Sequence, residues 1–144
     1  MAASSQIVCP SCGTRNRVPV ARSAGAANCG NCHRPLFDAH PAAVDADGLE
    51  QHLLGNDIPV LLDVWAPWCG PCRMAAPEVH ELAREMAGRG LVLKVNTEEY
   101  PTLAAQFRVQ SIPYFVLMRR GIILAERTGV VPRAEMRRWF AMAA

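Results

Sequence analysis

The sequence predicts an α/β domain behind a small cysteine-rich module. First, residues 59–65 form an apolar, partly β-branched run, which is typical of a buried central strand. Second, apolar residues recur at helical spacing over residues 72–88. Third, two Cys-x-x-Cys pairs lie near the N-terminus among glycines and prolines. We therefore expect a module of residues 1–38 and a domain of residues 39–144.

The composition indicates a globular protein. Of the 144 residues, 51% are hydrophobic and 19% are charged, which leaves enough apolar material for a core. A net charge of +2 is too small to indicate a nucleic-acid or membrane partner. The first residues lack a basic region followed by a long apolar run, so we expect a cytoplasmic protein. Six cysteines in a reducing compartment favour metal binding or redox chemistry over structural disulfides.

The first two cysteine pairs have the spacing of a four-cysteine zinc site. Cys9 and Cys12 are followed, after 16 residues, by Cys29 and Cys32. Each two-residue gap lets the chain turn so that both sulfurs reach one ion. Four free thiols or two disulfides are the alternative, and the near absence of large apolar residues in this module disfavours buried thiols. Metal binding would supply the stability that so small a core lacks.

Two other interpretations of this module remain open. Cys29 to His33 matches the C-x-x-C-H sequence that attaches c-type haem, and His33 could replace Cys32 as a metal ligand. Haem attachment would leave Cys9 and Cys12 without a role. We therefore expect one Zn²⁺, no haem and no bound nucleotide.

The third pair, Cys69 and Cys72, lies at the junction of the predicted strand and helix. Unpaired backbone N–H groups and the helix dipole favour a thiolate at Cys69, the expected nucleophile. Cys72, one turn further on, is the expected resolving thiol. Gly70 and Pro71 supply the turn, and Pro71 suits the first turn of a helix because its missing N–H has no helical partner. The absence of His or Lys between the cysteines favours a reducing couple.

Two charged residues are candidates for proton transfer. Asp63 lies inside the apolar run, where burial would raise its pKa and let it deprotonate Cys72. The alternative is an aspartate on an edge strand that points to water. Lys94 is the only lysine and could pair with Asp63, since lysine can lose its charge when buried. A solvated lysine at a strand end is the alternative.

The remaining elements complete the domain. Pro101 is typical of a helix start, and Pro132 is expected to start a final helix whose Met136, Trp139, Phe140 and Ala143 share one face. The expected ranges are a helix over 47–54, a strand over 91–96, a helix over 101–107, strands over 114–118 and 122–126 forming a hairpin, and a helix from 132.

Five groups of residues in order resemble the thioredoxin family. They are Trp68-Cys-Gly-Pro-Cys72, Asp63-Val-Trp-Ala66, Lys94-Val-Asn96, Ser111-Ile-Pro113 and Thr128-Gly129. With the Cys9 to Cys32 module in front, the chain is similar to the zinc-containing bacterial thioredoxin-2 subgroup. The resemblance implies a thioredoxin fold, with a central mixed sheet flanked by helices and a small zinc-ribbon-like module.

The resemblance also implies a substrate site. The Ile112–Pro113 bond would be cis, whereas the residues alone suggest an ordinary loop proline. Trp68, Ile112 and Gly129 would form a docking rim, with Gly70, Pro71 and Pro113 beside it, for an extended substrate strand. Tyr114 departs from the threonine that is usual in the family, which leaves target preference open.

The implied activity is reduction of protein disulfides by Cys69 and Cys72. The implied partners are disulfide-containing target proteins and a flavin-containing thioredoxin reductase that draws on NADPH. An oxidase or isomerase on the same fold is the second hypothesis. The third is a non-enzymatic adaptor or nucleic-acid binder that uses the arginines of the zinc module, Arg15, Arg17, Arg22 and Arg34.

Overall fold

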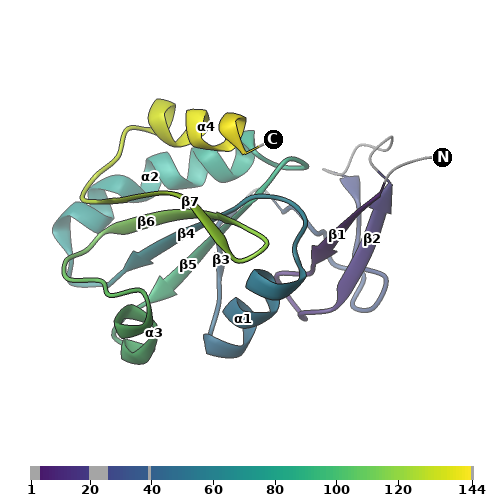
Figure 1. The fold of residues 1–144 in the computed structure, drawn as a ribbon, viewed down its shortest axis with the longest axis horizontal. Coiled ribbons are helices and arrows are strands. Elements are labelled where there is room, and N and C mark those ends of the chain that lie inside the picture. Colours follow the sequence, from purple (N-terminus) through teal and green to yellow (C-terminus); the bar gives the residue numbers. More distant parts are fainter. Residues whose placement is uncertain (1–3, 20–25, 39, 144) are drawn as a thin grey trace.

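The computed structural model describes residues 4–19, 26–38 and 40–143. Its larger unit is built on a five-stranded sheet with strand order β3-β5-β4-β6-β7 (Figure 1). Strands β3, β5 and β4 are parallel, and β6 and β7 are antiparallel to their neighbours, so the predicted mixed sheet is confirmed. The strands span Ala42–Ala43 (β3), Val60–Trp65 (β4), Leu91–Asn96 (β5), Tyr114–Arg119 (β6) and Ile122–Thr128 (β7).

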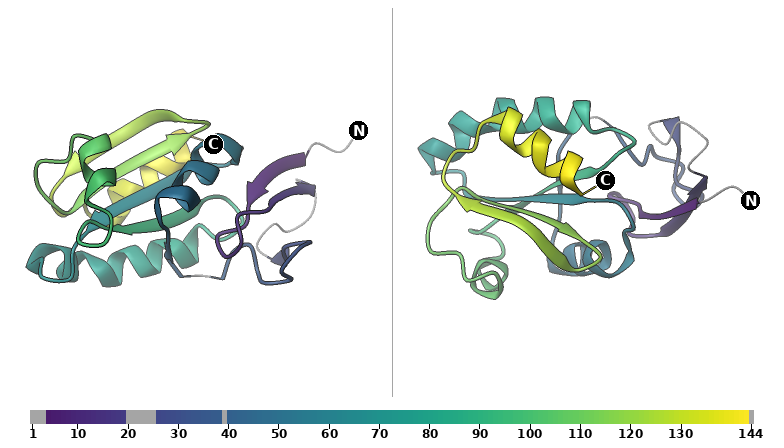
Figure 2. Two further views of the ribbon diagram at one scale, coloured as in Figure 1. Left: turned by 90° about the horizontal axis from the view of Figure 1, so that it is seen from below. Right: turned by 45° about the horizontal axis from the view of Figure 1, so that its top comes forward.

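Helices cover both faces of this sheet (Figures 1 and 2). Side chains of α2 and α4 form one core cluster with Leu61, Phe115 and Leu117 of the sheet. Leu49 and Leu103, from α1 and α3, belong to the cluster on the opposite face. The helices span Ala46–Gly55 (α1), Gly70–Glu85 (α2), Pro101–Gln106 (α3) and Arg133–Met142 (α4).

The bounds of α2 differ from the prediction at both ends. The helix begins at Gly70, so Cys69 is its N-cap and not a residue of its first turn. It ends at Glu85, earlier than expected, and Gly88 follows with a φ of 88°, a conformation that favours glycine. Pro77 lies inside the helix.

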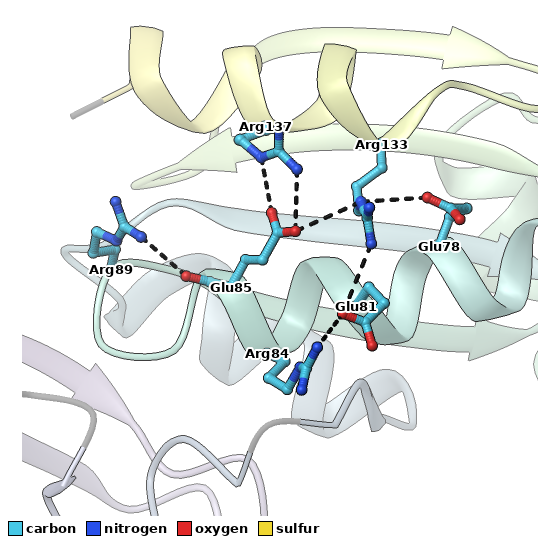
Figure 3. A network of polar contacts seen from close by, with 7 residues as sticks. All are labelled: Glu78, Glu81, Arg84, Glu85, Arg89, Arg133 and Arg137. Carbon is cyan, nitrogen blue, oxygen red and sulfur yellow. Dashed lines mark hydrogen bonds and ion pairs between the residues drawn. The ribbon is translucent and has the colours of Figure 1, made fainter.

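Ion pairs connect α2 to α4 along their solvent side (Figure 3). Arg137 donates to both carboxylate oxygens of Glu85, at 2.8 and 3.0 Å. Arg133 lies 3.3 Å from Glu78, 3.8 Å from Glu81 and 3.6 Å from Glu85. One helix therefore supplies the carboxylates and the other supplies the guanidinium groups.

The N-terminal module contains a hairpin that the sequence patterns did not predict. Strands β1 (Ser4–Val8) and β2 (Arg15–Pro19) pair antiparallel. Ile7, Leu36 and Phe37 are buried in the same core cluster as residues of α1 and the sheet. The few apolar side chains of the module therefore share the core of the larger unit.

Polar contacts hold β1 against the loop that follows α1. The Val8 N–H donates to Asn56 Oδ1 at 2.8 Å, and the Gln6 N–H donates to Asp57 Oδ2 at 2.7 Å. The Asp57 N–H donates in return to the Gln6 carbonyl at 2.8 Å.

The predicted boundary after residue 38 stays a prediction, and Ala39 lies outside the described residues. Within the described ranges, no helix is long and apolar enough to cross a membrane.

Candidate redox site and metal centre

The third cysteine pair lies at the head of α2. Cys69 and Cys72 are joined by a disulfide with a Cα–Cα distance of 5.3 Å. The Cys72 N–H donates to Cys69 Sγ at 3.2 Å, so the sulfur occupies the N-cap position. A backbone donor and the positive end of the helix dipole both stabilise negative charge on this atom. The arrangement therefore favours a Cys69 thiolate once the disulfide is reduced.

Cys69 and Cys72 are almost equally buried, with 4% and 5% of their surface exposed, but their surroundings differ. A groove of about 490 Å³ is lined by Cys69 but not by Cys72. Trp68, Gly70, Pro71, Ser111 and Ile112 also line it, together with three residues that the sequence patterns did not single out, Thr97, Val109 and Gln110. Trp68 is 66% exposed, a large apolar side chain open to solvent beside Cys69. Of the two cysteines, Cys69 is therefore the one that borders this groove.

Two other predicted docking residues lie close to each other. The Ile112–Pro113 bond is cis, as the resemblance implies. The Gly129 N–H donates to the Pro113 carbonyl at 2.8 Å, and Gly129 has a φ of 95°. Neither residue lines the groove, but the Ile112 carbonyl oxygen lies 3.8 Å from Cys69 Sγ. The loop thus brings backbone groups up to the candidate nucleophile.

Tyr114 points away from this groove. It belongs to the core cluster on the α1 and α3 face, and its hydroxyl donates to Glu126. Burial is the main cause that raises the pKa of this phenol, and the hydrogen bond to Glu126 adds to the effect. The departure from the family pattern therefore lies on the opposite side of the sheet from α2.

Asp63 is buried in the central strand β4, with 3% of its surface exposed. This position excludes the edge-strand alternative. Because side chains alternate along a strand, Asp63 shares with Leu61 the face that α2 covers. Its Oδ1 has no hydrogen-bond partner among the described residues. Burial raises the pKa of Asp63 to about 7, and the positive charge of Lys94 partly opposes this.

Lys94 lies beside Asp63 on the neighbouring strand β5, in parallel register. Its Nζ lies 4.4 Å from the centre of the Trp65 ring, a cation–π contact. Within the described part of the chain, no ion pair joins Lys94 to Asp63. Lys94 therefore acts on Asp63 through its charge, from the neighbouring strand, and not through an ion pair.

The four cysteines of the module converge on one point. Their Sγ atoms all lie within 4.8 Å of one another. Cys9 and Cys32 are 3.7 Å apart, and Cys12 and Cys29 are 3.6 Å apart. Four sulfurs arranged tetrahedrally at about 2.3 Å from Zn²⁺ would lie about 3.8 Å from one another. The residues present therefore fit a zinc ion, and His33 is not needed as a ligand.

The thiols of this cluster differ in their surroundings. Burial raises the pKa of Cys9 to about 12. Hydrogen bonds lower the pKa of the exposed Cys12 to about 6, and the largest effect comes from the Thr14 hydroxyl. The backbone N–H of Cys32 is the main cause of a lowered pKa at Cys29.

Of the module's arginines, Arg15, Arg17 and Arg34 are exposed, and Arg22 lies outside the described residues.

Comparisons with known proteins agree with this geometry. The family described as Thioredoxin matches residues 40–142, and the family described as Thioredoxin 2, N-terminal, matches residues 8–34. Thioredoxin C-3 of Corynebacterium nephridii is 39% identical over 133 residues, covering 92% of this chain and 91% of the relative. The thioredoxin of Haemophilus influenzae is 45% identical over 92 residues, covering 64% of this chain and 85% of the relative.

Solved structures are similar over almost three quarters of the chain. Chloroplastic thioredoxin z superposes with a TM-score of 0.67 at 27% identity, over 72% of this chain and 94% of that one. A mutant thioredoxin from Halobacterium salinarum does so with a TM-score of 0.67 at 29% identity, over 73% and 91%. Fold and disulfide together define a thiol–disulfide oxidoreductase. The chain belongs to the thioredoxin family, and its N-terminal part belongs to the zinc-ribbon family of thioredoxin 2.

Proposed function

We propose that the protein reduces disulfide bonds of target proteins and that Cys69 is the attacking group. One observation carries the proposal: Cys69 lines an open groove, and its Sγ accepts a hydrogen bond from the backbone at the head of α2. An accessible sulfur with a stabilised thiolate form is what nucleophilic attack on a disulfide requires.

The reaction has two exchange steps. The Cys69 thiolate attacks one sulfur of a target disulfide, which forms a mixed disulfide and releases the other target sulfur as a thiolate that takes a proton from water. Cys72 then loses its proton and attacks Cys69 Sγ. The second target sulfur leaves as a thiolate and is protonated. Two electrons pass to the target, and Cys69 and Cys72 end as a disulfide.

Asp63 is the proposed acceptor of the Cys72 proton. Its carboxyl lies on the sheet face that α2 covers, and a pKa of about 7 lets it take and return a proton near neutral pH. Lys94 is the proposed tuning residue, because its charge limits how far burial raises that pKa. Asp63→Ala should slow turnover while Cys69 still forms mixed disulfides. If Asp63→Ala turned over at the wild-type rate at every pH from 6 to 9, Asp63 would have no part in the mechanism.

The proposed target is an extended segment of polypeptide that carries a disulfide. Trp68, Gly70, Pro71 and Ile112 supply the walls of the groove, and Pro113, which is hydrogen-bonded to Gly129, follows Ile112 directly in the chain. Main-chain groups at this loop can pair with an extended chain whatever its side chains are. This arrangement suits a reductase that acts on many proteins.

A flavin-containing, NADPH-dependent thioredoxin reductase is the proposed source of electrons, because thioredoxins are generally re-reduced in this way. The test is insulin reduction coupled to NADPH oxidation through such a reductase, with Cys69→Ser as the inactive control. Activity equal to wild type in Cys69→Ser would refute the assignment of the nucleophile. A reduction potential as high as those of strong oxidants would instead favour the oxidase hypothesis.

We further propose that Cys9, Cys12, Cys29 and Cys32 hold one Zn²⁺, which would supply stability to the module. Metal analysis of the reduced protein should give one zinc per chain, lost when Cys9 is replaced by serine.

The proposed units are residues 1–38 and 39–144, and the proposed location is the cytoplasm. Limited proteolysis with and without chelator, and fractionation of cells, would test these two points.

A further inference from the structure

Side-chain amides reach from each half of the zinc module to a sulfur of the other half. Asn16, which follows the first cysteine pair, donates through Nδ2 to Cys29 Sγ at 3.6 Å. Asn31, which lies within the second pair, donates through Nδ2 to Cys12 Sγ at 3.8 Å. Backbone donors to sulfur in this cluster, by contrast, stay within one pair: the Ser11 N–H binds Cys9 and the Asn31 N–H binds Cys29, both at 3.4 Å.

Asn16 is the better held of the two asparagines. It is half-buried, its Nδ2 also donates to the Thr14 carbonyl at 3.1 Å, and its Oδ1 accepts from the Gly30 N–H at 2.9 Å. Both polar atoms of its side chain are therefore used. Asn31 is exposed, and among the described residues its side-chain amide makes one hydrogen bond, to Cys12 Sγ. Loss of Asn16 should therefore have the larger effect.

Both amides act on the same pair of sulfurs. Cys12 and Cys29 lie 3.6 Å apart across the two halves of the module. Four thiolates around Zn²⁺ carry a net charge of −2, and N–H donors offset excess charge on sulfur and fix its position. The Thr14 hydroxyl, 3.3 Å from Cys12 Sγ, can donate to the same pair when Cys12 is a thiolate.

We propose that Asn16 and Asn31 are positioning residues of the zinc site, and that their amides hold the Cys12–Cys29 side of the cluster closed. This inference depends on the proposed zinc site and assigns it residues beyond the four cysteines. Removing such partners typically weakens metal binding by about 10- to 100-fold. The site should therefore lose zinc faster without them, while all four sulfurs remain.

The test measures zinc release from the reduced, zinc-loaded full-length protein into excess chelator, followed with a zinc indicator. We expect Asn16→Ala to release zinc about 10- to 100-fold faster than wild type and Asn31→Ala a few-fold faster. Asn28→Ala is the matched control, because Asn28 is exposed beside Cys29 and no side-chain bond joins it to a sulfur among the described residues. It should release zinc at the wild-type rate.

Asn16→Asp separates the amide donor from a merely structural role. The aspartate keeps an acceptor for the Gly30 N–H but places a negative charge beside Cys29. It should therefore release zinc faster than Asn16→Ala. The sulfur-to-metal charge-transfer band of the Co²⁺ form should keep its four-thiolate intensity in every variant.

Wild-type release rates in both Asn16→Asp and Asn31→Ala would overturn the inference, even if Asn16→Ala failed to fold. A wild-type protein that binds no zinc would refute the metal site itself and the inference with it. Zinc in the wild type, with unchanged release in the variants, would refute the inference alone.

Discussion

Replacing Asp63 by asparagine should stabilise the oxidised protein, and increasingly so as pH rises. The side chain is 3% exposed, and burial raises its pKa from an ordinary 3.8 to about 7. Between these two values the unfolded chain holds an ionised Asp63, whereas the folded chain must bind a proton. Wild-type stability therefore falls as pH rises from about 4 to about 7 and stays at the lower level above that.

The magnitude follows from the two pKa values. One pH unit of difference corresponds to about 1.36 kcal/mol, so ionised Asp63 costs the folded state at most about 4 kcal/mol. Asparagine has nearly the same shape and no charge. The variant should thus exceed wild type by about 2 kcal/mol at pH 5.5 and by about 4 kcal/mol above pH 8.

Urea denaturation of both oxidised proteins across this pH range is the assay. Taking the difference at each pH cancels the contributions of all other groups, including the zinc cluster. Glu50→Gln, the same chemical change at an exposed position of α1, is the control and should stay within about 0.5 kcal/mol of wild type throughout. A difference for Asp63→Asn that does not change with pH would refute the claim that burial governs this carboxyl.

Three further predictions concern other parts of the molecule. Cys72→Ser should accumulate a mixed disulfide between Cys69 and a target, visible by mass spectrometry, because no resolving thiol remains; fast release of both target thiols would contradict the two-step exchange. Gly55→Ala should destabilise the protein by about 1–3 kcal/mol in urea denaturation, because a Cβ there would lie 2.7 Å from Val8 Cγ2 of the module. An unchanged urea midpoint would show that the Val8 side chain moves aside without loss of stability. Glu85→Gln should cost less than about 1 kcal/mol, and less in high salt, because its partners Arg137 and Arg133 are partly exposed. Arg137 lowers the pKa of Glu85, so this contribution should exist above the carboxyl's ordinary pKa and disappear as pH falls through the lowered value.

Local patterns were sufficient for the elements that carry the redox chemistry. The apolar run before Trp65 and the helical spacing after Cys72 predicted β4 and α2 to within a few residues. Such patterns are local, because they depend only on residues that are close together in the sequence. The two Cys-x-x-Cys pairs of the module likewise predicted a cluster that the structure brings within 4.8 Å. Strands β1 and β2 escaped prediction because they are short and their sequences do not strictly alternate between apolar and polar residues.

The amino-acid sequence by itself determined which residues are chemically able to exchange disulfides and to bind a metal. Only the tertiary structure decided how buried and how accessible they are. Asp63 has a raised pKa because β4 lies between β5 and β6 under α2, and the groove at Cys69 needs Thr97 and residues 109–112 from distant segments. Burial and charge environment depend on contacts between residues far apart in the chain, which no local spacing records.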